Sequence, residues 1–230
     1  MRAYFVPILA GGNLPDRLFA CIGAFVGIAL TGLISALLVH PAGAWLWIVA
    51  PMGASAVLVF AVPASPLAQP WPVVGGNVIS AMVGVTVAKL VPIPSLAAGL
   101  AVALAILAMS LTRSLHPPGG AAALTAVVGG PAVTSAGYLF PLLPIGLNAV
   151  ILAGIGLAFH RWSGHSYPHR PVPVAGYVVP PLSGLPHPED IDLALEELGE
   201  TFDVSREDLD LLFRRVEYHA AQRRGGAKTA

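Results

Sequence analysis

The residues best suited to chemistry lie in one stretch, Thr112–Leu124, which reads TRSLHPPGGAAAL. It combines a guanidinium, an imidazole and two hydroxyl groups with a Pro-Pro step and a Gly-Gly pair. Pro117 and Pro118 prevent a continuous helix, because each lacks an amide hydrogen and disfavours helical geometry in the residue before it. A helix can begin directly after them, with the N–H groups of Gly119 and Gly120 in its first turn. Because such a helix end attracts negative charge, the stretch predicts a site for an anion.

Three side chains of this stretch are candidate anion ligands: Arg113, Ser114 and His116. A charge near the centre of a bilayer costs about 2.5–3.5 kcal/mol on insertion scales, so an arginine kept there favours a functional role. The alternative is an arginine at the end of a span, with its charged group extended to the membrane surface. His116 could gate the site, couple a proton, cap a helix or pack as a hydrogen-bonded histidine. A metal site is not expected, since no second His, Cys or carboxylate stands at ligand spacing in the membrane region.

The composition is that of a membrane protein. Of 230 residues 56% are hydrophobic and only 10% are charged, whereas about a quarter are charged in soluble domains. Between Leu18 and Phe159 the only charged residues are Lys89 and Arg113, and this span contains no Asp or Glu. The net charge is zero, which argues against a nucleic-acid partner.

Six hydrophobic segments are expected to position these residues. Four runs are long enough to cross a hydrocarbon layer of about 30 Å as helices: residues 18–39, 73–90, 95–112 and 138–159. Two shorter segments, residues 44–62 and 118–128, are interrupted or opened by Pro and Gly and could be broken or re-entrant helices. The predicted fold is therefore an all-α polytopic membrane protein with four full spans, or six if the short segments also cross. Both counts put the two termini on one side, and the arginines near each end favour the cytoplasm.

The two halves of the membrane region resemble each other. Each half contains a long span, a short helix opened by Pro and Gly, and a further span, with Asn77 and Asn148 at comparable places. Chance agreement among small residues is the alternative to an internal repeat. A repeat would put a transport site at its interrupted helices. We expect free N–H groups to bind the anion at two helix starts, near Met52–Ser55 and near Gly119–Ala121. We expect Ser55, Gln69 and Asn77 to be buried around a shared polar path with the first stretch, because unpaired polar groups are costly in lipid.

The composition changes after Trp162. We divide the chain into a transmembrane domain (1–162), a Pro- and Gly-rich juxtamembrane linker (163–188) and a soluble helical tail (189–230). Ser205–Asp208 resembles a helix capping box. An apolar stripe at helical spacing either packs the tail helices together or contacts a partner; it consists of Leu209, Leu212, Phe213 and Val216.

Two segments, Ala50–Gln69 (APMGASAVLVFAVPASPLAQ) and Thr112–Leu124, resemble those of the HPP family of integral membrane proteins. The family name refers to the His-Pro-Pro that stands here at His116–Pro118. The resemblance implies a small polytopic protein with four spans, and nitrite transport has been proposed for plant plastid and cyanobacterial members. Many bacterial relatives carry CBS domains after the membrane part, and residues 189–224 resemble the preceding linker. We therefore expect the protein to lie in the bacterial inner membrane. We also expect no adenine-nucleotide binding within these 230 residues.

The predicted function is a permease or channel for a small inorganic anion, with nitrite suggested by the resemblance. Membrane carboxylates that would select cations are absent from the sequence of the spans. The alternative is a membrane scaffold or sensor that signals through the C-terminal helices. An enzyme is not expected, because His116 beside Ser114 lacks an acidic residue to orient it. We expect no cofactor, and we expect a homo-oligomer, with a dimer as the first guess.

Overall fold

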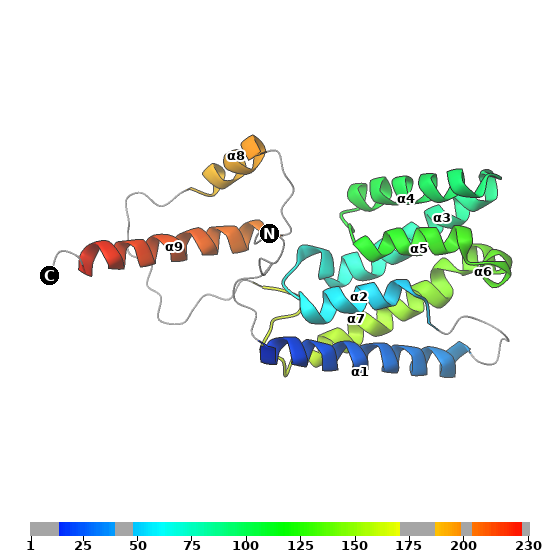
Figure 1. Cartoon of the computed structure of the whole chain (residues 1–230), viewed down its shortest axis with the longest axis horizontal. Helices are drawn as coiled ribbons and strands as arrows, with labels where there is room; N and C mark the ends of the chain where they lie inside the picture. Colours follow the sequence, from blue (N-terminus) through cyan, green and yellow to red (C-terminus); the bar gives the residue numbers. More distant parts are fainter. Residues whose placement is uncertain (1–13, 40–47, 171–186, 199–203, 227–230) are drawn as a thin grey trace, which may run out of the picture. The chain divides into compact units, whose positions relative to one another are not determined.

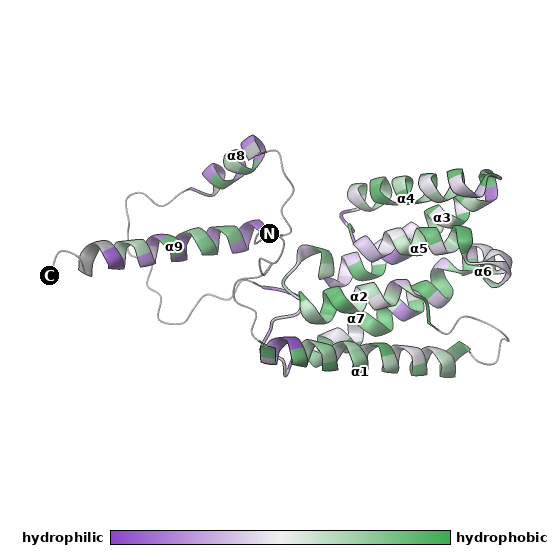
Figure 2. Cartoon of the chain, viewed as in Figure 1, coloured by the Kyte–Doolittle hydropathy of each residue, from purple (hydrophilic) through white to green (hydrophobic). Residues whose placement is uncertain are grey.

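The computed structural model describes residues 14–39, 48–170, 187–198 and 204–226, and these residues form helices and connecting turns without strands. The chain divides into two compact units, Met1–Pro168 and His169–Ala230, which we describe separately. The all-helical polytopic membrane fold predicted from the sequence is confirmed. Apolar residues dominate the helices of the first unit, whereas polar residues dominate those of the second (Figure 2).

The first unit follows the predicted order of segments (Figure 1). Its α-helices are α1 (Leu14–Val39), α2 (Pro51–Ala61), α3 (Asn77–Leu90), α4 (Pro94–Leu111), α5 (Pro117–Val128), α6 (Pro131–Ala136) and α7 (Leu147–Phe159). A π-helical turn, Pro72–Gly76, leads into α3, and an irregular turn, Pro141–Gly146, leads into α7. Proline opens α2, α4, α5 and α6, where its missing N–H costs no helical hydrogen bond.

Four helical segments of the described residues are long and apolar enough to cross a membrane: Leu14–Val39, Pro72–Leu90, Pro94–Leu111 and Pro141–Phe159. Helix α2 has 11 residues and α5 has 12, so each is only about 17–18 Å long. Helix α5 and the segment Pro131–Leu139 are bent by 94° and form either a broken span or a re-entrant loop. By length and composition, the described residues thus support four spans, or five if the bent pair counts as one.

The last hydrophobic run differs from the prediction. Tyr138 belongs to a 3₁₀ turn, Gly137–Leu139, and the final span begins only at Pro141. Helix α6 was not predicted either. It begins after Gly130, whose φ of 74° is readily adopted by glycine and turns the chain away from α5.

The contacts between helices follow the proposed repeat. Helix α4 packs against α3 and α5, and α1 packs in the same way against α7 and α2. Each short helix contacts the last span of the other half, because α5 lies on α3 and α2 lies on α7. In Figure 1 α4 and α1 form the two edges of this arrangement. The two halves are therefore interleaved rather than side by side.

Glycines set the close contact between α3 and α5. A Cβ atom added to Gly76 would lie 2.5 Å from Ser114 O, and one added to Gly84 would lie 2.4 Å from Ala123 O. A Cβ on Gly119 would lie 2.7 Å from Ser80 Oγ. Small residues at such positions let helix backbones approach closely, as is common in membrane helix packing.

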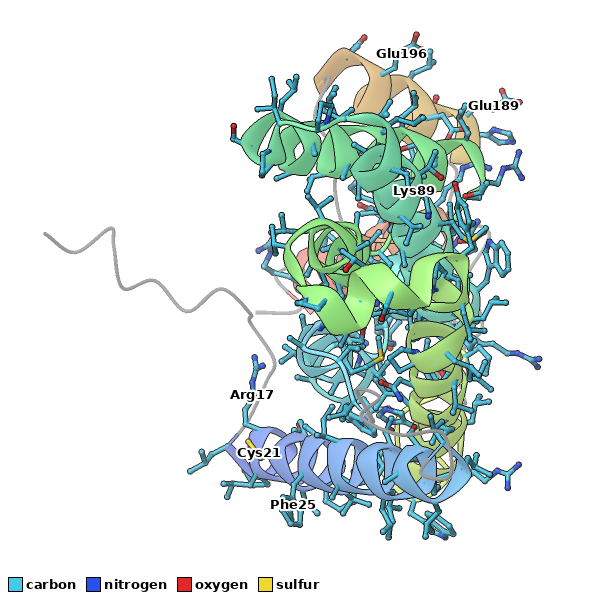
Figure 3. All side chains as sticks on the ribbon, turned by 90° about the vertical axis from the view of Figure 1, so that its right-hand side faces the viewer. Arg17, Cys21, Phe25, Lys89, Glu189 and Glu196 are labelled. Atoms are coloured by element: carbon cyan, nitrogen blue, oxygen red, sulfur yellow. The ribbon has the colours of Figure 1, made fainter. Side chains whose placement is uncertain are left out.

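The outer surface of the first unit is apolar. Large hydrophobic side chains on α1 are exposed, and Phe25, 74% exposed, points away from the other helices (Figure 3). The interior is filled by Met52, Val59, Phe140, Ile145 and Leu152. An apolar exterior is costly in water but suits a lipid environment, which agrees with the spans.

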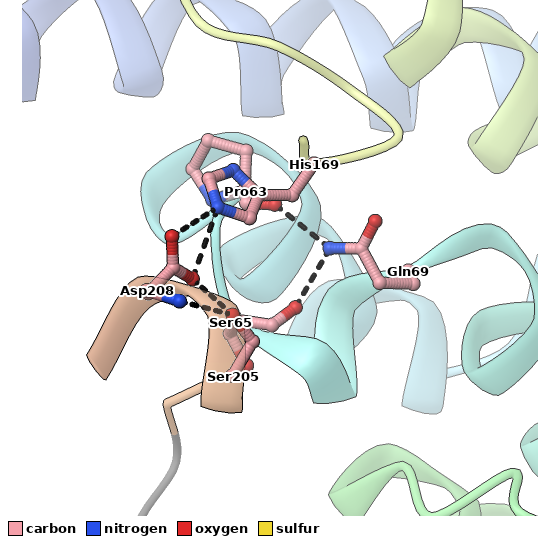
Figure 4. Close-up of polar contacts among 6 residues, drawn as sticks. All are labelled: Pro63, Ser65, Gln69, His169, Ser205 and Asp208. Carbon is pink, nitrogen blue, oxygen red and sulfur yellow. Dashed lines mark hydrogen bonds and ion pairs between the residues drawn. The ribbon is translucent and has the colours of Figure 1, made fainter. Parts of the chain in front are cut away.

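The second unit contains α8 (Pro188–Leu198) and α9 (Arg206–Gly226). The predicted cap is present, because Ser205 Oγ accepts a hydrogen bond from Asp208 N at 3.1 Å. The Asp208 carboxylate also accepts from the Ser205 hydroxyl and pairs with His169 (Figure 4). Arg206 joins the two helices through a 2.6 Å ion pair with Asp192. Most of the predicted linker, residues 171–186, lies outside the described residues.

Candidate functional site

His116 is the centre of a buried polar cluster at the start of α5. It precedes the first helical residue, has an extended backbone and is 0% exposed. Its Nδ1 lies 2.8 Å from Leu67 O, and its Nε2 lies 2.9 Å from Ser55 Oγ. A carbonyl oxygen can only accept, so Nδ1 carries the hydrogen and donates. In the neutral imidazole Nε2 is then an acceptor, and the Ser55 hydroxyl donates to it.

Asn77 continues this chain of hydrogen bonds in the same direction. Its Nδ2 donates to Ser55 Oγ at 3.1 Å and to Val73 O at 2.8 Å. The order is therefore Asn77 amide to Ser55 hydroxyl to His116 ring to Leu67 carbonyl. Four parts of the chain meet here: the first turn of α3, helix α2, the residue before α5 and the 3₁₀ turn Pro66–Ala68. The predicted meeting of Ser55, Asn77 and His116 is present in the structure.

Two polar atoms of this region have no hydrogen-bond partner. They are Asn77 Oδ1 and Ser80 Oγ, both buried. Asn77 and Ser80 are three residues apart on α3 and so lie on one face of the helix. That face meets α5, since a Cβ added to Gly119 would lie 2.7 Å from Ser80 Oγ. The cluster therefore offers one acceptor and one hydroxyl at the α3–α5 contact.

Asn148 gives an internal comparison for Asn77. It stands in the first turn of α7, as Asn77 does in α3. Its Nδ2 donates to Ser35 Oγ at 2.7 Å, and its Oδ1 accepts from Val49 N at 3.2 Å. Both ends of the Asn148 amide are thus hydrogen-bonded, whereas Asn77 Oδ1 is not. Two similarly placed asparagines differ at the atom that could meet a solute.

The start of α5 provides fewer anion donors than the sequence suggested. Pro117 and Pro118 have no N–H, and Gly119 N donates to His116 O at 2.8 Å. Helix α2 begins in the same way, because its first two amides after the opening proline donate back to the preceding turn at 3.0 Å each. The expectation of free N–H groups at these two helix starts is corrected for these positions. The amides of Met52, Gly53 and Gly119 thus donate to backbone carbonyls of the preceding turns.

Arg113 lies outside the buried cluster. Its residue is exposed, and its φ is 53°, in the left-handed region. It follows the end of α4, where Arg113 N donates to Ser110 O and Ser114 N donates to Met109 O. These two hydrogen bonds form a Schellman motif, whose left-handed position is usually glycine. The guanidinium is thus placed at the surface, and the alternative of an arginine at a span end agrees with the structure.

The other predicted ligands are divided between the cluster and its surroundings. Ser114 is buried, and its Oγ lies 2.7 Å from Thr112 Oγ1, which donates to Ala108 O. Gly120 is partly exposed, and a Cβ added there would meet only Val102, at 3.9 Å. Close approach of the backbone is therefore a property of Gly119 rather than Gly120.

Gln69 lies in the turn that follows α2. Its Nε2 donates to Pro63 O at 3.0 Å and to Ser65 O at 2.8 Å (Figure 4). These bonds close the turn between α2 and α3, and this turn carries the Leu67 carbonyl that His116 contacts. Gln69 therefore positions this carbonyl, and its role as an anion ligand stays a prediction.

The sequence alone did not identify Ser80 or Gly76 as part of the site. Ser80 stands three residues after Asn77, which is the spacing of one helix face and was an available signal. The role of Gly76 depends on the approach of Ser114 and His116 from a distant segment. Within the described ranges, no three His, Cys, Asp or Glu side chains gather as a metal site would require.

Comparisons with known proteins agree with this architecture. Two relatives from Dictyostelium discoideum, both named as transmembrane proteins, are 38% identical over 126 residues and 37% identical over 120 residues. The alignments cover 53% and 50% of this chain but 44% and 38% of the relatives, so the chain spans less than half of their length. No solved structure matches the chain. Residues 10–168 match the family described as HPP, transmembrane region, and the chain belongs to this family of membrane proteins.

Proposed function

We propose that this protein is a permease or channel for a small inorganic anion, with nitrite as the first candidate. The observation that carries the proposal is the pair of buried, unpaired polar atoms Asn77 Oδ1 and Ser80 Oγ at the α3–α5 contact. An unsatisfied buried polar group costs about 1–3 kcal/mol, so two on one helix face favour a role toward water or a solute. The proposed nitrite transport by other HPP proteins supports the choice of solute.

The charges of the membrane segment favour an anion over a cation. Between Leu18 and Phe159 the sequence has Lys89 and Arg113 but no carboxylate. A cation that leaves water needs carboxylate or carbonyl oxygens to replace its hydration shell, and the spans provide no carboxylates. The two basic residues instead attract anions toward the ends of the helices that carry them.

The hydrogen-bond character of the cluster suggests the form in which the solute passes. Asn77 Oδ1 can only accept a hydrogen bond, while the Ser80 hydroxyl can donate one. A bare anion has no hydrogen for Asn77 Oδ1, whereas its conjugate acid has one and can still accept from Ser80. We therefore expect nitrite to pass this point together with one proton, as neutral nitrous acid. Transport would then move no net charge.

Passage at this point requires α3 and α5 to separate. The close contact of Gly119 with Ser80 and with the backbone of α3 leaves these polar atoms covered. The contact between α3 and α5 is therefore the gate in this proposal.

Initial uptake rates in proteoliposomes test the proposal. We expect nitrite uptake above that of empty liposomes, with competition by nitrate, formate, chloride and sulfate measuring selectivity. Uptake should acidify the lumen and should not respond to an imposed membrane potential. Ser80→Ala removes the unpaired hydroxyl and should lower the nitrite rate about tenfold. Ser110→Ala is the matched control, because Ser110 is exposed and its hydroxyl bonds only to Ile106 O of its own helix.

Well-folded protein with no flux of any of these solutes would contradict the proposal. It would favour the alternative of a scaffold or sensor, for which the exposed Leu212, Phe213 and Val216 of α9 offer a contact surface. The proposal assigns no enzymatic step and no cofactor to the chain. It places the protein in a bacterial plasma membrane as a homodimer, and four spans put both termini in the cytoplasm beside the basic end segments.

A further inference from the structure

A second feature of α3 lies at its other end. A cavity of about 120 Å³ is walled by Val85, Ala88, Ala126 and Val133, with Lys89 and Thr134 as its polar side chains. Lys89 follows Asn77 by twelve residues, which corresponds to about 18 Å of helix. The cavity is therefore separate from the Asn77–Ser55–His116 cluster. It is formed where α3 ends beside the bend between α5 and α6.

Lys89 is held at this cavity by an aromatic ring. Its Nζ lies 5.6 Å from the centroid of the Tyr138 ring, within the range of a cation–π contact. The Tyr138 hydroxyl lies 3.2 Å from Thr86 Oγ1, which itself donates to Met82 O. Tyr138 is therefore the donor to Thr86, and this bond fixes the ring beside the ammonium. The ring attracts the charge but leaves hydrogens of the ammonium directed elsewhere.

The charge of Lys89 has no carboxylate counterion in its own membrane segment. The sequence from Leu18 to Phe159 contains no Asp or Glu. In the described part of the chain, Lys89 takes part in none of the observed ion pairs. The walls of the cavity are apolar, and a less polar surrounding strengthens the attraction between opposite charges. An ammonium beside such a cavity favours an anion from outside the chain.

We infer that this cavity binds an oxyanion against the Lys89 ammonium. The oxyanion is either a small inorganic ion from water or the phosphate of an anionic lipid headgroup. One buried water needs about 10–15 Å³ on the same measure of volume, so the cavity accommodates a small oxyanion with some of its water. Thr134 also lines the cavity, but its hydroxyl donates to Gly130 O and Pro131 O, so the Lys89 ammonium is the group that meets the oxyanion. This inference concerns binding and does not depend on transport.

Equilibrium binding to the full chain in lipid nanodiscs tests the inference in two arms. In the first, radiolabelled inorganic phosphate, with nitrite as competitor, is titrated into discs of phosphatidylcholine alone. In the second, discs contain phosphatidylglycerol without added phosphate, and the lipid that stays with the protein is measured by mass spectrometry. Saturable binding in the first arm identifies a free oxyanion, and retained phosphatidylglycerol in the second identifies a headgroup.

The variants are chosen so that charge and space can be separated. Lys89→Met removes the charge and should weaken binding tenfold or more, while Lys89→Arg should retain most of it. Ala88→Leu fills the cavity and should weaken binding with the lysine still present. Arg161→Gln is the control, because Arg161 is an exposed cation outside the cavity and its loss should change nothing.

The inference is overturned if wild-type protein binds no oxyanion in either arm. It is also overturned if folded Lys89→Met binds as tightly as the wild type. These outcomes are independent of the flux measurements, because a protein that binds at Lys89 need not transport and a transporter need not bind there.

Discussion

His116 keeps one hydrogen-bonding pattern because each ring nitrogen faces a partner of defined character. Leu67 O can only accept, and Ser55 Oγ then donates to the other nitrogen. The pattern uses every donor of the Asn77 amide and leaves its oxygen unpaired. The Asn77 amide hydrogens thus hold the site together, and the Asn77 oxygen remains to accept from a solute. The residue types in the sequence had instead suggested a site that donates hydrogen bonds to an anion.

Ser55→Ala should destabilise the membrane unit. The change removes the atom that accepts from Asn77 and donates to His116, so one Asn77 Nδ2 hydrogen and the His116 Nε2 atom lose their partner in a buried place. We expect a loss of about 1–3 kcal/mol in the free energy of unfolding, measured by denaturation in mild detergent. Ser110→Ala, on an exposed face, should change this free energy by less than about 0.5 kcal/mol. Equal effects of the two changes would contradict the hydrogen-bond chain.

Arg113→Gly should stabilise the protein. The left-handed φ of 53° is unfavourable for a residue with a Cβ and free for glycine. The gain should reach at most about 1 kcal/mol, because glycine also loses more chain entropy on folding. Arg113→Ala retains the Cβ and is the control for loss of the charge. If the glycine variant is no more stable than the alanine variant, the backbone at Arg113 is not strained.

His160 should make stability depend on pH. Its Nε2 donates to Val59 O at 2.8 Å, and its Nδ1 accepts from Ser163 Oγ at 2.7 Å. Burial lowers the pKa of its imidazole below the usual 6.5, and nearby His165 lowers it further, although the bond to Val59 opposes this. Below pH 6.5 the unfolded chain therefore binds more protons than the folded one, and stability falls as the pH drops.

Thermal unfolding midpoints between pH 5 and pH 8 measure this effect. The slope should be reduced in His160→Gln, whose amide can still donate to Val59 O but does not titrate. His219→Gln, an exposed change in α9, should leave the slope unchanged. An identical slope in wild type and His160→Gln would remove this histidine from the explanation.

At the level of elements, the contact between α3 and α5 depends on which face α5 turns inward. Gly119 faces α3, and Gly120 faces open space near Val102. Neighbouring residues in a helix point about 100° apart, so two adjacent glycines have different roles.

The hydrophobic segments themselves were predictable, because each is defined by its own local composition. The rotation of α5 about its own axis could not be predicted, because it depends on glycines on α3 that are distant in sequence.

The hydrogen bonds that the first amides of α2 and α5 make to the preceding turns were only partly predictable. That proline has no N–H to offer follows from the sequence. The turns that use the next amides depend on the backbone before each helix, which the sequence pattern does not specify. Asn77 was predicted as a buried amide, but its unpaired oxygen can be recognised only in the folded structure, where the corresponding oxygen of Asn148 accepts from Val49 N.

Gly119→Ala and Gly120→Ala form a matched pair of substitutions. At Gly119 the new methyl group would lie 2.7–2.8 Å from Ser80 Oγ, Gly76 O and Met109 Sδ, so α5 must shift. We expect a loss of about 1–3 kcal/mol in unfolding free energy and a strong loss of nitrite flux. Gly120→Ala should be neutral or stabilising, because the space is open and alanine favours helix. Equal losses would contradict the assigned face of α5.

At the level of the whole molecule, the second unit carries an exposed apolar surface on α9. Leu212, Phe213 and Val216 are 54%, 43% and 56% exposed. We expect this surface to strengthen the proposed homodimer. Changing all three residues to serine should shift the protein toward monomers at low concentration, as measured by mass photometry in nanodiscs. Leu193→Ser on α8 is the control, and an unchanged distribution in the triple variant would exclude this surface from the assembly.

The interleaving of the two halves has a consequence for biogenesis. Helix α3 belongs to the first half, but its glycine face packs on α4 and α5 of the second. While the ribosome is still making the second half, the first can enter the membrane, but no helix yet packs on Gly84 and the Ser55 hydroxyl lacks His116. The first half must then wait in the bilayer, or beside an insertion chaperone, until α5 arrives. A gene divided within the short connection between α3 and α4 should thus yield two fragments that are degraded singly and accumulate only when made together.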